Sequence, residues 1–232
     1  MKNLMLFACC AFFTAFAACS SNDDAPPVPT ALLQITHAAP GAGGLDLGLD
    51  GLRINNLPFN YLANTGYLDA YAGQRQFKVN LAGSGTTLID QRIQLAESKR
   101  YSIMVYDTGA NVKHLFLEDE FPAVEAGKAH IRFFHLTPDA PAVTIGYNSG
   151  GTFTPIFSDR SFETQATATQ NQAFTAVAAA SYTLEVRRAS DNTVVFSRPG
   201  VALTEGKIYT FYARGLVNSL VTPLGAEVII NR

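Results

Sequence analysis

Two prolines three residues apart, Pro138 and Pro141, restrict what this chain can form more than any other feature of it. Proline has no backbone N–H and a fixed φ, so neither residue fits inside a helix or a central strand. The apolar segment 130–134 precedes the pair, the segment 143–147 follows it, and Asp139 between the prolines favours a turn. We therefore predict that one strand ends before the prolines, that the chain turns tightly, and that another strand begins after them.

The same plan occurs earlier in the chain. His37 and Pro40 correspond to His135 and Pro138 at one offset, because 135 − 37 and 138 − 40 both give 98. The earlier copy has Gly41 in place of the aspartate and lacks the second proline. The order of parts is a strand, the motif His-x-x-Pro, a small or acidic turn and a second strand. This order resembles the bacterial family called domain of unknown function 4397, and the fuller second copy carries most of the likeness. That family implies no established activity.

Alternation of apolar and polar residues with a period of two runs through most of the chain from residue 31 onward. Leu45, Leu47 and Leu49 would lie on one side of a strand, with the residues between them on the other side. Turn-forming clusters that contain glycine separate similar segments, and no segment has a convincing helical period. Further segments with this alternation are 77–81, 87–95, 101–106 and 114–117. These patterns predict an all-β protein.

The internal repeat extends beyond the turn motif. Segments 95–103 and 203–211 match at an offset of 108, and segments 77–79 and 184–186 match at 107. Because the offset at the turn motif is 98, the second copy should carry about nine extra residues after Tyr147.

Each repeat is near a hundred residues long and contains about seven short strands, which is typical of an immunoglobulin-like sandwich. We therefore expect two tandem immunoglobulin-like antiparallel β-sandwich domains, at residues 30–122 and 127–231, each with its own core. Proline and glycine around residues 121–127 favour a boundary there.

The N-terminus has the features of an export signal. Lys2 precedes an apolar run at residues 4–18, which is shorter than the roughly 20 residues that span a membrane. The run ends in Phe16-Ala17-Ala18-Cys19, which resembles a bacterial lipobox, with Phe16 where leucine or valine is usual. The resemblance implies that Cys19 is acylated, whereas a plain secretory signal cut near Ala18 is the alternative. No cysteine follows Cys19, so an exported domain would have no disulfide.

These features predict a signal peptide at residues 1–18 and an acylated cysteine with a flexible tether at residues 19–29. The lipid would attach the protein to the membrane, so we expect an outer-membrane lipoprotein of the bacterial cell envelope. The segment Ser20-Ser21-Asn22-Asp23-Asp24 resembles the signal that sends some lipoproteins to the cell surface, and a solvated linker explains it equally well.

The chain contains no local pattern that indicates catalysis, a metal or another cofactor. One histidine per repeat is too few for a zinc site, and Gly83-Ser84-Gly85 is not a nucleophile elbow. We expect the histidines to bond backbone groups in the turns, with metal ligation or general-base catalysis as the alternative. The residues of this structural turn motif are His37, Pro40, His135, Pro138, Asp139 and Pro141. With 17 basic and 19 acidic residues and no basic stripe, nucleic acid is not an expected partner.

Two segments, 57–67 and 150–162, interleave aromatic residues with amides and hydroxyls. Exposed rings beside such groups suit contact with a glycan or a peptide, whereas inward-facing rings of ordinary strands would give the same spacing. The candidate ligand-binding residues are Phe153, Phe157, Phe162, Tyr61 and Tyr67. On a regular strand Phe153 and Phe157 would share a face, as an exposed platform or as part of the core.

The sequence therefore predicts a lipid-anchored envelope protein that acts as a non-catalytic surface binding or adhesion module with a glycan or protein ligand. A structural spacer or scaffold is the first alternative. A hydrolase or metal-dependent enzyme with a site between the repeats is the second.

Overall fold

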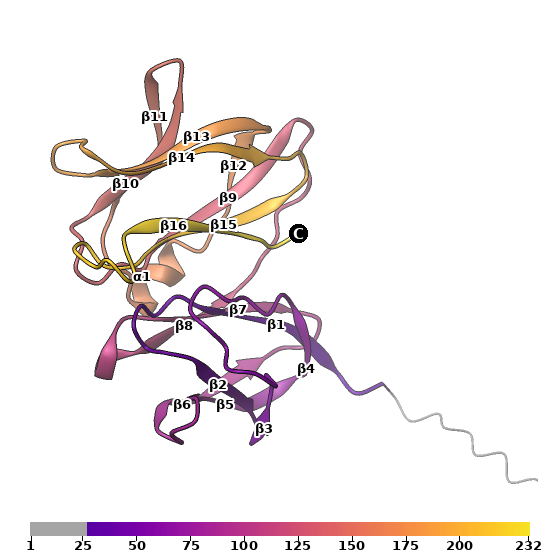
Figure 1. Cartoon of the computed structure of the whole chain (residues 1–232). Helices are drawn as coiled ribbons and strands as arrows, with labels where there is room; N and C mark the ends of the chain where they lie inside the picture. The colour runs from indigo at the N-terminus through magenta and orange to yellow at the C-terminus, as the bar shows by residue number, and fades with distance from the viewer. Residues whose placement is uncertain (1–26) are drawn as a thin grey trace, which may run out of the picture.

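The computed structural model describes residues 27–232. The expected signal peptide, Cys19 and most of the tether lie outside this range. Strands make up nearly all of the regular secondary structure of the described part and form two β-sandwich units, so the predicted fold class is confirmed (Figure 1).

We call β1–β8 the first unit and β9–β16 the second unit. The first unit consists of β1 (Thr30–His37), β2 (Leu45–Leu49), β3 (Leu52–Arg53), β4 (Leu68–Tyr71), β5 (Gly73–Leu81), β6 (Thr87–Leu95), β7 (Arg100–Tyr106), the 3-10 turn η1 (Gly109–Asn111) and β8 (Lys113–Glu118). The second unit consists of β9 (Lys128–His135), β10 (Val143–Ser149), β11 (Thr152–Arg160), α1 (Gln165–Gln170), β12 (Thr175–Ala178), β13 (Ala180–Arg188), β14 (Val194–Leu203), β15 (Ile208–Arg214) and β16 (Gly225–Ile230).

The two units have the same strand order. The first unit pairs its strands as β4-β1-β7-β8 and β3-β2-β5-β6, and the second as β12-β9-β15-β16 and β11-β10-β13-β14. Each strand of the second unit is thus the counterpart of the strand numbered eight lower. Most pairs are antiparallel, but β1 pairs with β7, and β9 with β15, in parallel. The period-two pattern predicts the strands and cannot reveal this pairing.

The extra length of the second unit lies in the β10–β11 hairpin, and α1 adds none, because the connection from β11 to β12 is as long as that from β3 to β4. The offset between counterparts is 98 at the start of β10 and 107 at the start of β12, so the additional residues fall between those strands. β3 has two residues where β11 has nine. Thr164 caps α1 by accepting a hydrogen bond from the backbone N–H of Thr167, which starts a helix that the sequence pattern did not predict.

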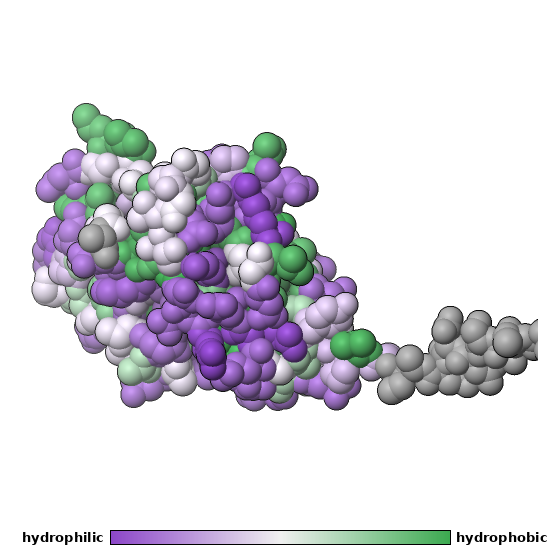
Figure 2. All heavy atoms as spheres, turned by 90° about the horizontal axis from the view of Figure 1, so that it is seen from below, coloured by the Kyte–Doolittle hydropathy of each residue, from purple (hydrophilic) through white to green (hydrophobic). Residues whose placement is uncertain are grey.

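Each unit has an apolar core between its two sheets. Phe77 and Ile103 are buried in the first core, and Phe133 and Phe211 in the second. The outward side chains of β5 and β6 are polar, as the alternation predicts, and Lys78 lies 3.6 Å from Asp90 there. Figure 2, which views the molecule from the side of these strands, shows a mostly hydrophilic face.

A third apolar cluster joins the two units. Met104 and Leu115 of the first unit pack with Phe134, Leu136 and Tyr212 of the second. The sheets that contain β7 and β15 therefore face each other, and these two strands are buried nearly from end to end instead of on alternate residues (Figure 1). The two sandwiches therefore meet at a buried apolar interface.

No helix within residues 27–232 has both the length and the apolar character needed to cross a membrane.

Candidate functional site

His135 lies buried inside the turn that follows β9. Its Nδ1 accepts a hydrogen bond from the backbone N–H of Thr137 at 3.2 Å, so Nε2 carries the proton and donates to the carbonyl of Pro141 at 3.1 Å. Burial lowers the pKa of His135, which keeps the ring neutral. Pro138 is half-buried beside it, and exposed Asp139 accepts a hydrogen bond from the N–H of Val217.

His37 has the same geometry after β1. Its Nδ1 accepts from the N–H of Ala39 at 3.3 Å, and its Nε2 donates to the carbonyl of Gly43 at 2.9 Å. Burial lowers the pKa of His37 as well. Pro40 is buried in the turn and Gly41 is exposed. Both nitrogens of each ring are thus occupied by backbone groups, which is what the structural role requires and what a metal ligand or an accessible base would not have.

Phe153 and Phe157 do not share a face, so the expected two-ring platform does not form. Gly146 of β10 pairs with Pro155, whereas the preceding residue, Ile145, pairs with Phe157, so β11 contains one additional residue at that point. Proline cannot donate to the ladder, and the shift beside Pro155 turns the two rings to opposite sides.

The surroundings of the two rings follow from this shift. Phe157 is buried in the second core, with its ring stacked 6.5 Å from that of Phe133. Phe153 lies half-buried on the outer side, with the Arg187 guanidinium 4.0 Å from its ring centroid. Phe157 is therefore a core residue.

Tyr61, Tyr67 and Phe162 lie where the two units meet. Burial raises the pKa of Tyr61 to about 12, and charged groups of the second unit are near enough to influence it. Burial and the neighbouring Asp119 carboxylate raise the pKa of Tyr67. The ring of Phe162 packs 5.5 Å from that of Tyr106. These aromatic residues connect the units, which sequence reasoning could not foresee.

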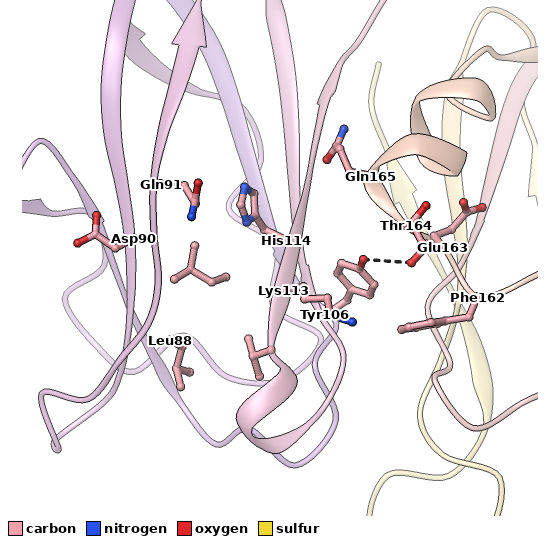
Figure 3. A pocket seen from close by; sticks show the side chains of 12 residues that line it. Leu88, Asp90, Gln91, Tyr106, Lys113, His114, Phe162, Glu163, Thr164 and Gln165 are labelled. Atoms are coloured by element: carbon pink, nitrogen blue, oxygen red, sulfur yellow. Dashed lines mark hydrogen bonds between the residues drawn. The ribbon is translucent and has the colours of Figure 1, made fainter.

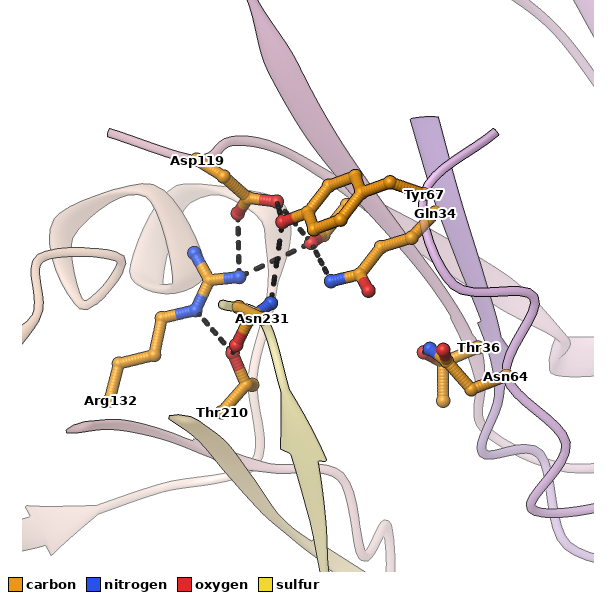
Figure 4. A network of polar contacts seen from close by, with 9 residues as sticks. Gln34, Thr36, Asn64, Tyr67, Asp119, Arg132, Thr210 and Asn231 are labelled. Carbon is orange, nitrogen blue, oxygen red and sulfur yellow. Dashed lines mark hydrogen bonds and ion pairs between the residues drawn. The ribbon is translucent and has the colours of Figure 1, made fainter. Parts of the chain in front are cut away.

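A buried polar network crosses the junction (Figure 4). Asp119, just after β8, pairs with Arg132 of β9 at 2.6 Å, and both side chains have an exposed fraction of 0%. Tyr67 donates its hydroxyl to Asp119 at 2.6 Å, and Ser102 also donates to this carboxylate. Arg132 Nε donates to the Thr210 hydroxyl at 2.9 Å.

The network continues on both sides of this pair. Thr210 donates to the side-chain carbonyl of Asn231 at 2.7 Å, and the Gln34 amide donates to Ser102 at 2.7 Å. Because a buried ion pair must keep its partners in place, this network fixes how the two units are oriented.

A groove lies between the edge strands β6 and β8 of the first unit and the start of α1 (Figure 3). We call it the junction groove; its volume is about 510 Å³. Gln165 of α1 forms one wall, and its side-chain amide bonds both the N–H and the carbonyl of Phe116 at 2.8 Å. Helix α1 therefore covers the open edge of β8 at Phe116 and forms one side of the groove.

Polar groups of β6 and β8 face into the junction groove. Within residues 27–232, the Gln91 amide and the His114 imidazole have no hydrogen-bond partner. Burial lowers the pKa of His114, so the ring is neutral. Lys113 pairs with Asp107 at 2.9 Å, and its Nζ lies 5.9 Å from the ring centroid of Phe162.

A second groove of about 450 Å³ lies at the other end of α1. Phe121 and Phe174 line it and meet edge to face at 5.9 Å, with Gln170 and Gln172 beside them. The Arg100 guanidinium lies 5.3 Å from the Phe121 ring, which fixes this ring against the first unit. The connection between β11 and β12, which contains α1, thus forms walls of both grooves.

Of the predicted ligand-binding residues, only Phe162 lines the junction groove. Gln91, Lys113, His114 and Gln165 were missed, because they come from three separate elements that only the folded chain brings together. Within residues 27–232, no group of three or more His, Cys, Asp or Glu residues is arranged to hold a metal ion.

Comparison with models of protein families matches residues 31–146 to a domain of unknown function (DUF4397). This match covers half of the 232-residue chain. The chain belongs to the DUF4397 family. The matched region runs from β1 to β10 and contains both His-x-x-Pro turns. The two buried histidines and their backbone hydrogen bonds therefore lie within the part of the chain that resembles the family. The search of curated proteins found no match.

Proposed function

We propose that this DUF4397 protein is a lipid-anchored, non-catalytic binding module of the bacterial cell envelope, built from two tandem copies of the family domain. The lipobox-like sequence ending at Cys19 supports the anchor. The identical strand order of the two units, and the same histidine contacts in both turns, support a second copy.

The observation that carries the binding role is the junction groove. Its volume falls in the range of about 300–1,000 Å³ that is usual for ligand sites. It combines the rings of Tyr106 and Phe162 with the free amide of Gln91 and the neutral imidazole of His114. Rings that contact an apolar face, beside donors and acceptors that fix direction, suit a glycan.

The carboxylates and the lysine near the groove have partners within the protein. Lys113 is paired with Asp107, and Asp90 with Lys78. Glu163 is buried and accepts hydrogen bonds from Thr167 and Asn171. General acid–base catalysis needs a titratable group that is free to reach the substrate, and His114 is the lining residue that fits this description, so the non-catalytic role rests on our proposal and not on the pairing of the charges.

A glycan array tests this proposal, with the wild type compared with the double variant Gln91→Ala, His114→Ala. We expect the variant to lose at least about tenfold in affinity for the bound glycans, because it removes both free polar groups. The matched control is Gln74→Ala with Gln94→Ala, which removes two amides from the outer face of the same sheet and should change nothing. Equal losses in both double variants, or no bound glycan at all, would reject the groove as the site.

The buried network favours a second candidate function, a rigid spacer. A fixed orientation of two sandwiches is what a stalk needs, whether or not a ligand binds. If the wild type binds no glycan on the array, and cells that carry Arg132→Met show the same defect as cells that lack the protein, the spacer becomes the favoured function.

A further inference from the structure

The first unit carries exposed apolar side chains beside the point where the chain enters the fold. Leu52 of β3 is 76% exposed, and Tyr71 of β4 is 61% exposed. Both line a groove of about 340 Å³ between these two edge strands, together with Thr30 at the start of β1. We call it the entry groove. Figure 1 shows β3, β4 and the start of β1 on the side of the first unit where the described chain begins.

The second unit provides an internal comparison, because the strand pairing aligns the two units residue by residue. The counterpart of Tyr71 is Ala178, and the counterpart of Leu52 is Thr154, since each takes the same place in its strand pair. Both counterparts are exposed as well. The fold therefore tolerates a small or polar side chain at these positions, and only the first unit has large apolar ones there.

The chain before β1 indicates what meets the entry groove. Cys19 and Thr30 are 30 − 19 = 11 residues apart, so a lipid on Cys19 keeps the start of β1 within about 40 Å of the membrane even if the chain between them is fully extended. Residues 20–26 contain only Ser, Asn, Asp, Ala and Pro, so this segment has no large apolar side chain that could fill the groove. The bilayer surface is the apolar partner within reach.

The charges that line the entry groove cancel, because it has two arginines and two aspartates. Arg53 pairs with Asp46, and Arg75 pairs with Asp50 at 3.1 Å, which leaves Asp69 as the other lining charge. A groove without net positive charge does not select anionic lipid. The contact instead depends on its apolar side chains, and tyrosine and leucine suit the border between headgroups and acyl chains.

We propose that the entry groove rests on the bilayer that holds the lipid, with Leu52 and Tyr71 inserted at the level of the headgroups. This inference rests on the lipid anchor of the proposed function, and it adds which side of the anchored protein meets the membrane. Figure 1 shows α1 and β8 on the side of the molecule away from the start of β1. This orientation therefore leaves the junction groove open to a ligand.

Tryptophan fluorescence in lipid vesicles tests the contact, because the chain has no tryptophan of its own. The lipidated protein with Leu52→Trp or Tyr71→Trp is reconstituted in phosphatidylcholine vesicles, either plain or with bromine on the acyl chains near the headgroups. Bromine quenches a tryptophan that it touches, so we expect it to lower the emission of both variants at least about twofold. Thr154→Trp, at the exposed counterpart position of the second unit, is the matched control and should keep its emission.

An added charge tests which side chains make the contact. Leu52→Asp combined with Tyr71→Trp should reduce the quenching at least about twofold, because a carboxylate opposes insertion among lipids. Leu57→Asp combined with Tyr71→Trp is the control, since Leu57 is 78% exposed and lies outside the entry groove, and it should leave the quenching unchanged.

Flotation of the wild type with the vesicles on a density gradient measures the anchor separately. Protein that floats, with no more quenching in Leu52→Trp and Tyr71→Trp than in Thr154→Trp, would overturn the contact and leave the anchor in place. Protein that does not float would overturn both. Emission that shifts to the blue but is not quenched by bromine would also overturn the contact and would assign the entry groove to a second copy of the chain.

Discussion

Replacement of Arg132 by methionine tests whether the two units are joined as the structure indicates. The change removes the ion pair with Asp119 at 2.6 Å and the hydrogen bond from Nε to Thr210 at 2.9 Å, while the methionine side chain keeps much of the buried volume. It leaves the Asp119 carboxylate buried with only the hydroxyls of Tyr67 and Ser102 as donors.

The expected cost follows from burial. Removal of one partner of a fully buried ion pair typically costs about 3–5 kcal/mol, because the remaining charge is left without compensation. Addition of Asp119→Asn neutralises that charge and keeps an oxygen for the two hydroxyls. The double variant should therefore recover about 1–3 kcal/mol relative to Arg132→Met alone.

Equilibrium unfolding in urea, followed by far-UV circular dichroism because the chain has no tryptophan, measures these differences. Lys78→Met is the matched control. It breaks the exposed pair with Asp90, whose two side chains are 42% and 43% exposed, and should cost at most about 1 kcal/mol. A loss for Arg132→Met as small as that of the control, or no recovery in the double variant, would refute the buried network.

Three further predictions concern the core, the histidine turns and the anchor. Phe157→Ser should cost about 3–5 kcal/mol in the same assay, as core truncations do, whereas Phe153→Ser on the outer side should cost much less. Burial lowers the pKa values of His37 and His135 in the folded chain, so unfolding takes up protons. The free energy of unfolding should thus be highest above the pKa of about 6.5 that histidine has in the unfolded chain, and it should fall as the pH drops below that value. His135→Asn should make this fall less steep. An unchanged fall in that variant would count against the buried neutral ring. Metabolic labelling with a fatty acid should tag the wild type and not Cys19→Ala, and equal labelling of both would reject the lipid anchor.

The strands and the two His-x-x-Pro turns could be predicted because their signals are local. Proline and period-two alternation act over a few residues, and the change in offset between the repeats correctly placed the extra length of the second unit. The bulge beside Pro155 could not be predicted, because the proline shows that the ladder is interrupted but does not show which way the chain shifts.

The interface between the units left a signal that alternation alone did not capture. Ile103-Met104-Val105 in β7 and Phe133-Phe134 in β9 are consecutive apolar residues, which is typical of strands covered on both faces. Arg132 within such a run indicates a buried charge that needs a partner. The partner, Asp119, could not be named in advance, because it approaches from the other unit.

The groove residues could not be predicted for the same reason. Gln91, His114 and Gln165 are ordinary polar residues in the sequence, and they become a candidate site only because α1 packs against the edge of β8. The short α1 has no apolar period and depends on its cap and its contacts, so neither its presence nor its position followed from periodicity.

Differential scanning calorimetry of the chain tests most directly whether the two sandwiches form one body, on which both the junction groove and the buried network depend. The internal repeat alone predicts two units that unfold separately, whereas the shared apolar cluster and the Arg132–Asp119 pair predict a single cooperative unit. We expect one transition in which the calorimetric and van't Hoff enthalpies agree. Two separate transitions, with one unit still folded after the other has melted, would contradict the account.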